Sequence, residues 1–322
     1  MSMLSLIRHP ERYQGRKKQN RYFEGWYFKL VNREGNLTLS FIPGISKNKK
    51  DSHAFMQVIL RDERGIGTLE TKYLRFEVDD FNVTDDPFEI QLAAHRFSFS
   101  GLKLQSDEIQ GTIQFSTITP IHTSTISPNI MGPYAYLQFM ECYHGVLSMS
   151  HTLEGSLIYQ GEVLNFSGGK GYIEKDWGRG FPISYVWLQS NHFDQEDVSF
   201  LLSVAKIPFG FMHYDGMIVN LQIGKEEYRF ATYNAARILK KEVREGYVSY
   251  TIQKRKLRLE VEAKTAKAIE LVAPKSGVMD HAIKEGLSGE IHLQLWKKNQ
   301  LLYQGKGIAA GIEIVQALES IQ

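Results

Sequence analysis

The chain has 322 residues, of which 43% are apolar and 12% aromatic, and its net charge is +2 with histidine counted as neutral. A chain of this length can bury a large core without disulfides or metals, and the single cysteine, Cys142, excludes an internal disulfide framework. The small net charge and the absence of recognition motifs argue against nucleic-acid partners. No stretch is apolar enough for a signal peptide or a membrane span, so we expect a cytoplasmic globular protein.

Apolar and polar residues alternate with a period of two along most of the chain, which indicates β-strands. Turn formers such as Asp85-Asp86-Pro87 separate the short apolar runs. About 18 candidate strands follow from this pattern, which is too many for one small barrel and enough for two. Amphipathic helix is scarce, and residues 234–243 and 278–284 are its weak candidates. The expected fold class is all-β, with two antiparallel β-barrels in tandem and little helix.

The first twenty residues differ from the rest because they are basic and contain few apolar side chains. Their cations are Arg8, Arg12, Arg16, Lys17 and Lys18. We predict a basic N-terminal arm over residues 1–20, either as a solvated tail or as a strap across the sheet. Contact with an anionic membrane surface is the sharper alternative.

Residues 21–29 carry the first carboxylate among aromatic side chains. On a strand, alternation places Glu24 on the same face as Trp26 and Phe28. If this face points inward, Glu24 must be paired, hydrogen-bonded or protonated, because an isolated buried charge is too costly. Two interpretations remain open: a salt bridge with an arginine that closes the barrel, or a carboxylic acid that can donate a proton.

Residues 116–135 form an irregular stretch with three prolines among serines and threonines. Proline is excluded from central strands, so this stretch is expected to be a long loop or a crossing between sheets. Aromatic-rich blocks open each half of the chain, at residues 22–30 and 172–189. We therefore place one barrel at residues 21–168 and the second at residues 169–322.

Residues 140–151 contain Cys142, His144 and His151, which together invite a zinc site. On a continuous strand, however, Cys142 and His144 point one way and His151 the other, so no metal site is predicted. A Cys–His nucleophilic pair lacks an assigned orienting acid. Either histidine is expected to be a buried, hydrogen-bonded group, with a role as catalytic base as the alternative.

Residues 171–182 carry a second group of carboxylates close to a tryptophan. Alternation places Tyr172, Glu174 and Asp176 on one face of a strand. Neighbouring carboxylates repel each other, so one of them should titrate high unless a nearby cation, Lys175 or Arg179, intervenes. Glycines and a proline then bend the chain and place Trp177 at a strand end, where sites tend to lie.

Residues 184–192 mix large aromatic side chains with amides on one face of a strand. This face holds Tyr185, Trp187, Gln189 and Asn191. Such a mixture is more typical of the wall of a ligand cavity than of a dry core.

Common phosphate-loop, dinucleotide, metalloprotease and serine-hydrolase motifs are all missing from the sequence. What remains is a β protein with carboxylates set among aromatic side chains. That combination suits cofactor-free acid chemistry on an apolar substrate, in which aromatic faces stabilise a cation. It suits simple binding of an apolar ligand equally well.

Two of these blocks resemble signatures of the tocopherol cyclase family. The block Tyr22–Lys29 is similar to the N-terminal signature of that family, and Gly171–Gly178 with Trp187–Phe193 resembles its central signature. The resemblance covers the chain from about residue 20 onwards. It implies two lipocalin-like (calycin-type) barrels and closure of a prenylated quinol or phenol to a chromanol without a cofactor, an intramolecular lyase or isomerase reaction.

The resemblance also implies roles for the singled-out residues. The acid candidates are Glu24, Glu174 and Asp176. The candidates for substrate binding are Trp26, Trp177, Tyr185, Trp187, Gln189, Asn191 and His151. The expected partner is an apolar or prenylated small molecule, with no nucleic acid and with peripheral contact to a membrane surface as an alternative. A non-catalytic carrier of an apolar ligand and a hydratase of an isoprenoid double bond are the alternative functions.

Overall fold

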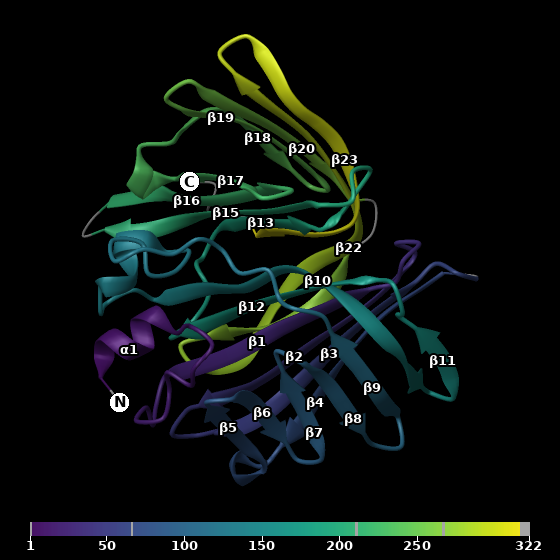
Figure 1. The fold of residues 1–322 in the computed structure, drawn as a ribbon. Helices are drawn as coiled ribbons and strands as arrows, with labels where there is room; N and C mark the ends of the chain where they lie inside the picture. The colour runs from purple at the N-terminus through teal and green to yellow at the C-terminus, as the bar shows by residue number, and fades with distance from the viewer. Residues whose placement is uncertain (1, 66, 210–211, 266–267, 316–322) are drawn as a thin grey trace. The chain divides into compact units, whose positions relative to one another are not determined.

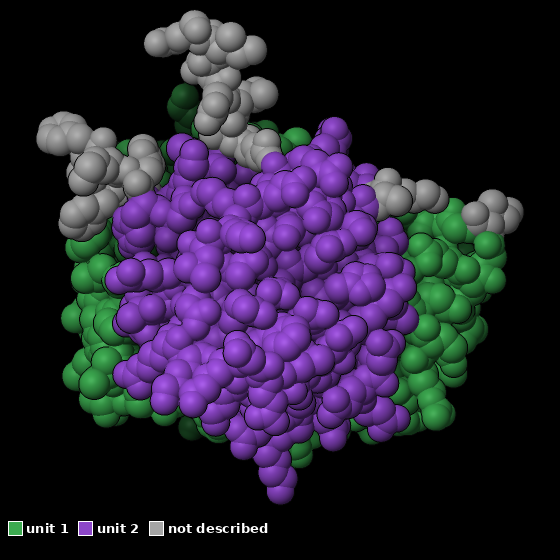
Figure 2. Space-filling view, turned by 90° about the horizontal axis from the view of Figure 1, so that it is seen from above, with its two compact units in different colours: residues 1–181, 272–282 green, residues 182–271, 283–322 purple. Residues whose placement is uncertain are grey.

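The computed structural model describes residues 2–65, 67–209, 212–265 and 268–315. Strands dominate it (Figure 1), which confirms the predicted all-β class. The chain forms two compact units, which Figure 2 distinguishes by colour. Unit 1 comprises residues 1–181 and 272–282, and unit 2 comprises residues 182–271 and 283–322.

Unit 1 contains one short α-helix and a large antiparallel sheet. The sheet order is β4-β3-β2-β1-β12-β10-β9-β8-β7-β6-β5, with β11 paired to β10. The elements of this part of the chain are α1 (Met3–Arg8), β1 (Tyr22–Val31), β2 (Leu37–Lys47), β3 (His53–Asp62), β4 (Thr68–Phe76), η1 (Val78–Asp80), β5 (Phe81–Asp85), β6 (Phe88–Leu92), β7 (His95–Ser98), β8 (Gly101–Gln105), β9 (Ile109–Phe115), η2 (Gly132–Tyr136), β10 (Cys142–Tyr159), β11 (Glu162–Asn165) and β12 (Lys170–Gly178).

Unit 2 is built mainly on the second sheet of the chain. Its order is β17-β16-β15-β13-β23-β22-β20-β19-β18, with β14 paired to β23 and β21 paired to β22. The elements of this part of the chain are β13 (Tyr185–Ser190), β14 (His192–Phe193), β15 (Val198–Phe209), β16 (Met212–Ile223), β17 (Glu226–Ala231), η3 (Thr232–Asn234), β18 (Arg237–Arg244), β19 (Tyr247–Lys254), β20 (Leu257–Lys264), β21 (Ile269–Lys275), β22 (Val278–Lys297) and β23 (Gln300–Val315). Residues 272–282, at the β21–β22 turn, belong to unit 1.

Each sheet buries one face in an apolar cluster, as period-two patterning requires. In unit 1 this cluster includes Trp26, Phe28 and Ile173, and in unit 2 it includes Leu188 and Phe200. The opposite face of β1 is also buried, since all ten residues of the strand are buried. A strand buried on both faces explains why its sequence reads as a continuous aromatic run rather than a clean alternation.

Several predictions about local structure can now be compared with the fold. The irregular stretch at residues 116–135 indeed contains no strand, and lies between β9 and β10. The two weak helix candidates were wrong, because residues 237–244 and 278–284 lie in β18 and β22. Hairpin pairing with the neighbouring strands, of β18 with β19 and of β22 with β21, overrode their local helical pattern. The compact units divide after residue 181 rather than 168, because β12 pairs with β1 and β10.

Candidate functional site

The pairing of β1 with β12 sorts the predicted acids onto two faces of one sheet. Glu24 lies opposite Trp177, whereas Glu174 lies opposite Tyr27 on β1. Glu24 and Trp177 therefore share the face of the apolar core of unit 1, and Glu174 shares the opposite face with Asp176. The structure separates Glu24 from the other two carboxylates.

Glu24 forms an ion pair with Lys175, and both side chains are fully buried. Lys175 Nζ lies 2.5 Å from Glu24 Oε1. The carboxylate also accepts hydrogen bonds from the backbone N–H groups of Gln14 and Gly15, both at 2.8 Å, and from the Tyr22 hydroxyl at 2.7 Å. Burial lowers the pKa of Lys175, which the negative charge of Glu24 opposes. The predicted salt bridge at Glu24 is present, with a lysine rather than an arginine as its cation.

The same lysine anchors the N-terminal arm to unit 1. Lys175 Nζ donates to the carbonyl oxygens of Pro10 and Arg12, at 2.8 and 2.6 Å. Trp26 Nε1 donates to the carbonyl oxygen of Glu11 at 3.0 Å. These bonds hold the backbone of residues 10–15 against the sheet, so the arm is a strap rather than a solvated tail.

Lys175 also lies over the rings of Trp26 and Trp177, two of the aromatic residues predicted to bind the substrate. Its Nζ lies 4.3 Å from the ring centroid of Trp26 and 4.9 Å from that of Trp177. The ring of Trp177 also stacks on the ring of Tyr143, with 5.5 Å between the ring centroids. The cation–π interactions of this cluster are therefore made with the protein's own lysine. These contacts indicate a structural role for all three residues. The catalytic role predicted for Glu24 and the substrate-binding roles predicted for Trp26 and Trp177 stay predictions.

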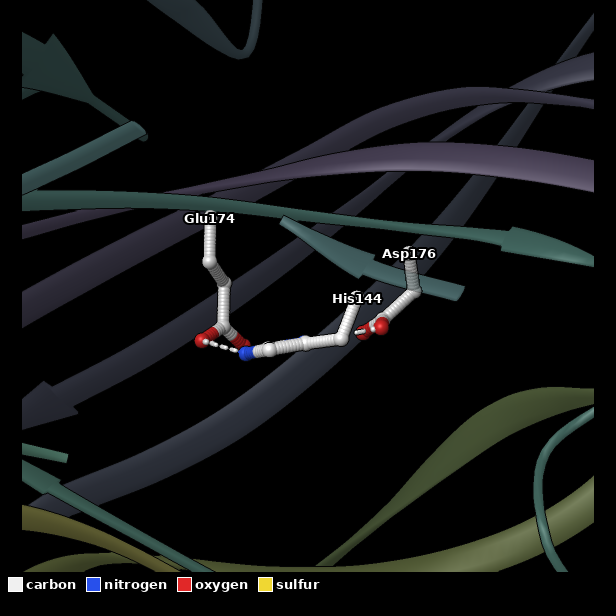
Figure 3. Close-up of side chains that lie close together, drawn as sticks. All are labelled: His144, Glu174 and Asp176. Atoms are coloured by element: carbon white, nitrogen blue, oxygen red, sulfur yellow. Dashed lines mark hydrogen bonds and ion pairs between the residues drawn. The ribbon is translucent and has the colours of Figure 1, made fainter. Parts of the chain in front are cut away.

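The opposite face of the sheet brings Glu174 and Asp176 together with His144 of β10 (Figure 3). His144 Nδ1 lies 2.9 Å from Asp176 Oδ1, and His144 Nε2 lies 3.6 Å from Glu174 Oε2. The Tyr172 hydroxyl donates a hydrogen bond to Glu174 Oε2 at 2.6 Å. The side chain of Asp176 is 26% exposed, against 7% for Glu174 and 12% for His144. Asp176 is thus the most accessible member of this histidine–carboxylate cluster.

Electrostatics in the cluster favour a protonated histidine. Burial by itself lowers the pKa of His144, but the negative charges of Asp176 and Glu174 and the hydrogen bond to Asp176 outweigh it and raise the pKa to about 9. The cation between the two carboxylates is therefore His144, and not Lys175 or Arg179, the two candidates from the sequence. Burial and the adjacent Glu174 raise the pKa of Tyr172, which keeps its hydroxyl protonated as a donor.

The three side chains also bear on metal binding, since their donor atoms lie within 4.8 Å of one another. The imidazole ring, however, lies between the carboxylates, with Nδ1 facing Asp176 and Nε2 facing Glu174 (Figure 3). One ion cannot accept both ring nitrogens, so a metal would have to displace one of these contacts. The arrangement suits proton transfer along carboxylate–imidazole–carboxylate better than metal ligation.

His151 lies on the core face of β10, opposite to the side that carries His144. Its Nδ1 is 2.9 Å from the Ser148 hydroxyl, and its ring packs at 4.4 Å from that of Phe115. Nε2 is buried and has no hydrogen-bond partner in the part of the chain that the structure describes. Burial lowers the pKa of His151 to about 3, so it is a neutral core histidine. Its predicted role in substrate binding stays a prediction.

A glycine on β12 makes room for this ring. A Cβ atom at Gly171 would lie 2.2 Å from His151 Nε2, which is far inside van der Waals contact. We expect Gly171→Ala to lower the free energy of unfolding by about 1–3 kcal/mol, because the ring must move within a packed core. Urea unfolding measures this change. In a His151→Ala background the same substitution should cost little, and an equal cost in both backgrounds would contradict the steric explanation.

The predicted ligand-binding face of residues 184–192 is on β13 in unit 2. Tyr185 donates a hydrogen bond from its hydroxyl to Glu313 Oε2 at 2.6 Å. Gln189 lies opposite Gly311, and a Cβ there would lie 2.5 Å from Trp187 Cζ3, so the indole packs over that glycine. Asn191 follows the end of β13, and its Oδ1 contacts His192 Nδ1 at 3.1 Å. All four residues are buried, and their roles in binding stay predictions.

A groove of about 470 Å³ lies elsewhere on unit 2, on the polar face of β19, β20, β22 and β23. Serine, threonine, glutamine and charged side chains line it. None of the predicted site residues is among its lining residues, so it contributes nothing to the site described above.

His144 is the member of this cluster that was not among the predicted site residues. Its face on β10 was predicted correctly, but the alignment of β10 with β12 sets it directly opposite Asp176. The sequence did hold a signal for this cluster, because two strands each carry polar residues at alternate positions. One strand carries Cys142 and His144, and the other carries Glu174 and Asp176. Nothing in the sequence shows that these two strands are neighbours.

The comparison with known families bears on this site. A family model described as tocopherol cyclase-like matches residues 94–315, which is more than half of the chain. The chain belongs to the tocopherol cyclase-like family. The resemblance found in the sequence is thereby confirmed. The match includes His144, Glu174 and Asp176, whereas Glu24 lies outside it.

Two curated members of this family are plant proteins. The chain is 24% identical to "Probable tocopherol cyclase, chloroplastic" of Oryza sativa subsp. japonica and 26% identical to "Tocopherol cyclase, chloroplastic" of Zea mays, over 205 residues in each case. These matches cover 58% of this chain and 41% of each plant protein. The chain therefore spans less than half the length of these relatives.

Solved structures show the same fold at low sequence identity. The structure of CghA with Sch210972 has a TM-score of 0.61 at 8% identity and covers 92% of this chain and 89% of its own. Kievitone hydratase from Nectria haematococca has a TM-score of 0.52 at 13% identity, with 96% and 94% coverage. These likenesses confirm the predicted lipocalin-like all-β fold, although the described strands do not close either sheet into a ring. In the described residues, no helix is long and apolar enough to span a membrane.

Proposed function

We propose that this protein is an acid catalyst that closes a prenylated quinol or phenol to a chromanol without a cofactor. The observation that carries the proposal is the cluster of His144, Glu174 and Asp176 inside the part of the chain that matches the family. A group with a pKa of about 9 keeps a proton at neutral pH, between two carboxylates that can receive it. Proton-initiated cyclisation needs such a stored and directed proton.

In the proposed reaction, the proton passes from His144 Nδ1 to Asp176 Oδ1 and from there to the prenyl double bond. Asp176 is the delivering group because it is more exposed than Glu174 and is hydrogen-bonded to the imidazole. Protonation of the alkene leaves a tertiary cation, and the phenol oxygen forms the new C–O bond to it. The phenol proton then returns to the Asp176 carboxylate, so the acid is regenerated and the product is an isomer of the substrate.

The surroundings of the cluster favour this chemistry. Tyr27 lies opposite Glu174 on the neighbouring strand, and both tyrosines beside Glu174, Tyr27 and Tyr172, are buried. Aromatic faces and a nearby carboxylate stabilise a transient cation. Glu174 stays in place because the Tyr172 hydroxyl and His144 hold it. Tyr185, Trp187 and Gln189 of unit 2 stay candidates for binding the substrate.

Incubation of the purified protein with a panel of prenyl quinols tests the proposal. Product NMR detects the chromanol, since cyclisation leaves the mass unchanged. We expect Asp176→Asn and His144→Gln each to lower turnover at least about a hundredfold, which is the usual contribution of a positioned acid. Glu174→Gln should lower it less, because Glu174 holds the imidazole and does not deliver the proton.

Glu141→Gln is the matched control, because Glu141 is an exposed carboxylate just before β10 and its contact with Arg179 is a long ion pair of 3.9 Å. It should leave turnover unchanged.

A product heavier by one water would indicate the hydratase alternative, which uses the same cation and which the fold shared with kievitone hydratase supports. Tight binding without turnover of any substrate would indicate a carrier. Full activity of Asp176→Asn and His144→Gln would contradict the proposed site.

A further inference from the structure

Six exposed cations gather on unit 1 around the start of β1. They come from three segments that are far apart in the sequence. Together they form the basic rim: Lys17, Lys18, Arg21, Lys49, Lys50 and Lys275. Lys17 and Lys18 belong to the arm and Arg21 follows it, Lys49 and Lys50 lie in the β2–β3 turn, and Lys275 is the last residue of β21.

Two hydrogen bonds and one close backbone approach hold the three segments side by side. The N–H of Lys49 donates to Asn20 Oδ1 at 3.0 Å, and Lys47 Nζ donates to the carbonyl oxygen of Gly15 at 2.9 Å. The β21–β22 turn abuts the start of β1, since a Cβ at Gly277 would lie 2.3 Å from the N atom of Tyr22. The basic rim is therefore a built surface, positioned by the strap and two turns.

The positive charge of the basic rim is not balanced locally. None of its six residues takes part in an ion pair among the described residues. Of the carboxylates close in sequence to these residues, Glu11 pairs with His9, Glu24 with Lys175 and Asp51 with Arg75, while the exposed Asp280 of β22 has no ion pair among the described residues. The whole chain has a net charge of only +2, so the remainder carries net negative charge. The asymmetry indicates an anionic partner at this surface.

The basic rim lies at the end of β1 that is near the histidine–carboxylate cluster. Arg21 immediately precedes β1, and Asp176 is paired with Gly25, about 13 Å further along the strand. An exposed apolar residue lies close to this end as well. This residue is Phe139, which is 65% exposed and comes two residues before Glu141. Backbone hydrogen bonds connect Glu141 to the β21–β22 turn: the N–H of Arg179 donates to the carbonyl oxygen of Glu141, and the N–H of Gly277 donates to the carbonyl oxygen of Arg179. Cations beside an exposed aromatic side chain are typical of proteins that lie on lipid headgroups.

We propose that unit 1 docks through the basic rim on the surface of an anionic lipid bilayer. Phosphate and carboxylate groups of the headgroups would complement its six cations, and Phe139 would insert at the interface. Docking in itself does not depend on the proposed catalysis. Its benefit to the enzyme does rest on the proposed function, because a prenylated quinol partitions into the bilayer and would enter next to the acid.

Vesicle sedimentation of the full chain tests the docking directly. The probes are vesicles of one third phosphatidylserine and two thirds phosphatidylcholine, and vesicles of phosphatidylcholine alone. Each basic residue near an anionic surface contributes about fivefold to binding. We expect K17E/K18E/K49E/K50E to bind the anionic vesicles at least about a hundredfold more weakly than the unchanged protein. High salt should weaken binding of the unchanged protein in the same way.

The matched control is K225E/K240E/K256E/K297E, which reverses four exposed lysines of unit 2 and should bind like the unchanged protein. Equal binding to both kinds of vesicle, or equal weakening by the two quadruple variants, would overturn the proposal. Stronger binding to soluble RNA than to anionic vesicles at the same salt concentration would also overturn it, in favour of a polyanion site. Turnover of a detergent-dispersed prenyl quinol by the rim variant should be unchanged, which separates failed docking from failed catalysis.

Discussion

Replacing Lys175 by methionine should lower the free energy of unfolding of unit 1 by about 3–5 kcal/mol, since it leaves one member of a buried ion pair without its partner. Glu24 and Lys175 are both fully buried, and the lysine also holds two carbonyl groups of the arm. Methionine keeps much of the volume and the contact with the tryptophan rings but removes the charge and the donors. Urea unfolding followed by tryptophan fluorescence measures the loss.

The double variant Lys175→Met, Glu24→Gln serves as the control for this explanation. It removes both charges, so it should recover part of the stability that the single variant loses. The arm should remain loosened in both, because the carbonyl groups of Pro10 and Arg12 have lost their donor. Limited trypsin digestion reports this separately, through faster cleavage after Arg12, Arg16, Lys17 and Lys18. Unchanged unfolding and unchanged cleavage in Lys175→Met would show that the pair anchors nothing.

The alternation of side chains allowed correct prediction of which residues share a face. It placed Glu24 with Trp26, Glu174 with Asp176, and His151 apart from His144, and the pairing of the strands agrees with each of these. It also predicted the all-β class. Period-two geometry is local to one strand, so a single sequence is enough to show it.

The pairing of the strands is what the sequence could not provide. β1 and β12 are neighbours in the sheet although more than a hundred residues separate them, and β10 lies on the other side of β12. Only this arrangement shows that Lys175 neutralises Glu24, and that His144 lies between Glu174 and Asp176. A single chain carries no record of such register, because any polar strand could pair with any other.

The domain boundary failed to emerge from the sequence for a related reason. The glycine-rich stretch before residue 171 marks a turn, and a turn between strands of one sheet has the same composition as a linker. The chain continues from it into β12, which completes the sheet of unit 1, and the compact unit ends only after residue 181. Composition identifies the turn but cannot assign the strand that follows.

Stability should be greatest near pH 6.5 and fall on both sides, because two buried histidines have pKa values shifted in opposite directions. His151 has a pKa of about 3 in the folded chain and about 6.5 when unfolded. The contribution of His151 to the free energy of unfolding is complete above pH 6.5. As the pH falls from 6.5 to 3, the unfolded chain binds a proton at His151 and the folded chain does not, so the free energy of unfolding falls by up to about 5 kcal/mol.

His144 produces the opposite slope. Its pKa is about 9 in the folded chain, so its contribution is complete below pH 6.5 and is lost as the pH rises towards 9. Between pH 6.5 and 9 the unfolded chain releases the proton that the folded chain keeps on His144. The free energy of unfolding therefore falls by about 3 kcal/mol over this range. The two histidines are on opposite faces of β10, so their effects should be separable by single substitutions.

Urea unfolding at pH 4, 6.5 and 9 checks both slopes, with His151→Gln and His144→Gln as paired variants. His151→Gln should weaken the loss of stability in acid and leave the alkaline side unchanged, whereas His144→Gln should do the reverse. Each variant is the control for the other, because carboxylates elsewhere in the chain contribute equally to both. If His144→Gln kept the full alkaline loss, the imidazole between Glu174 and Asp176 would not be the protonated group, and the proton store proposed for catalysis would have to be sought elsewhere.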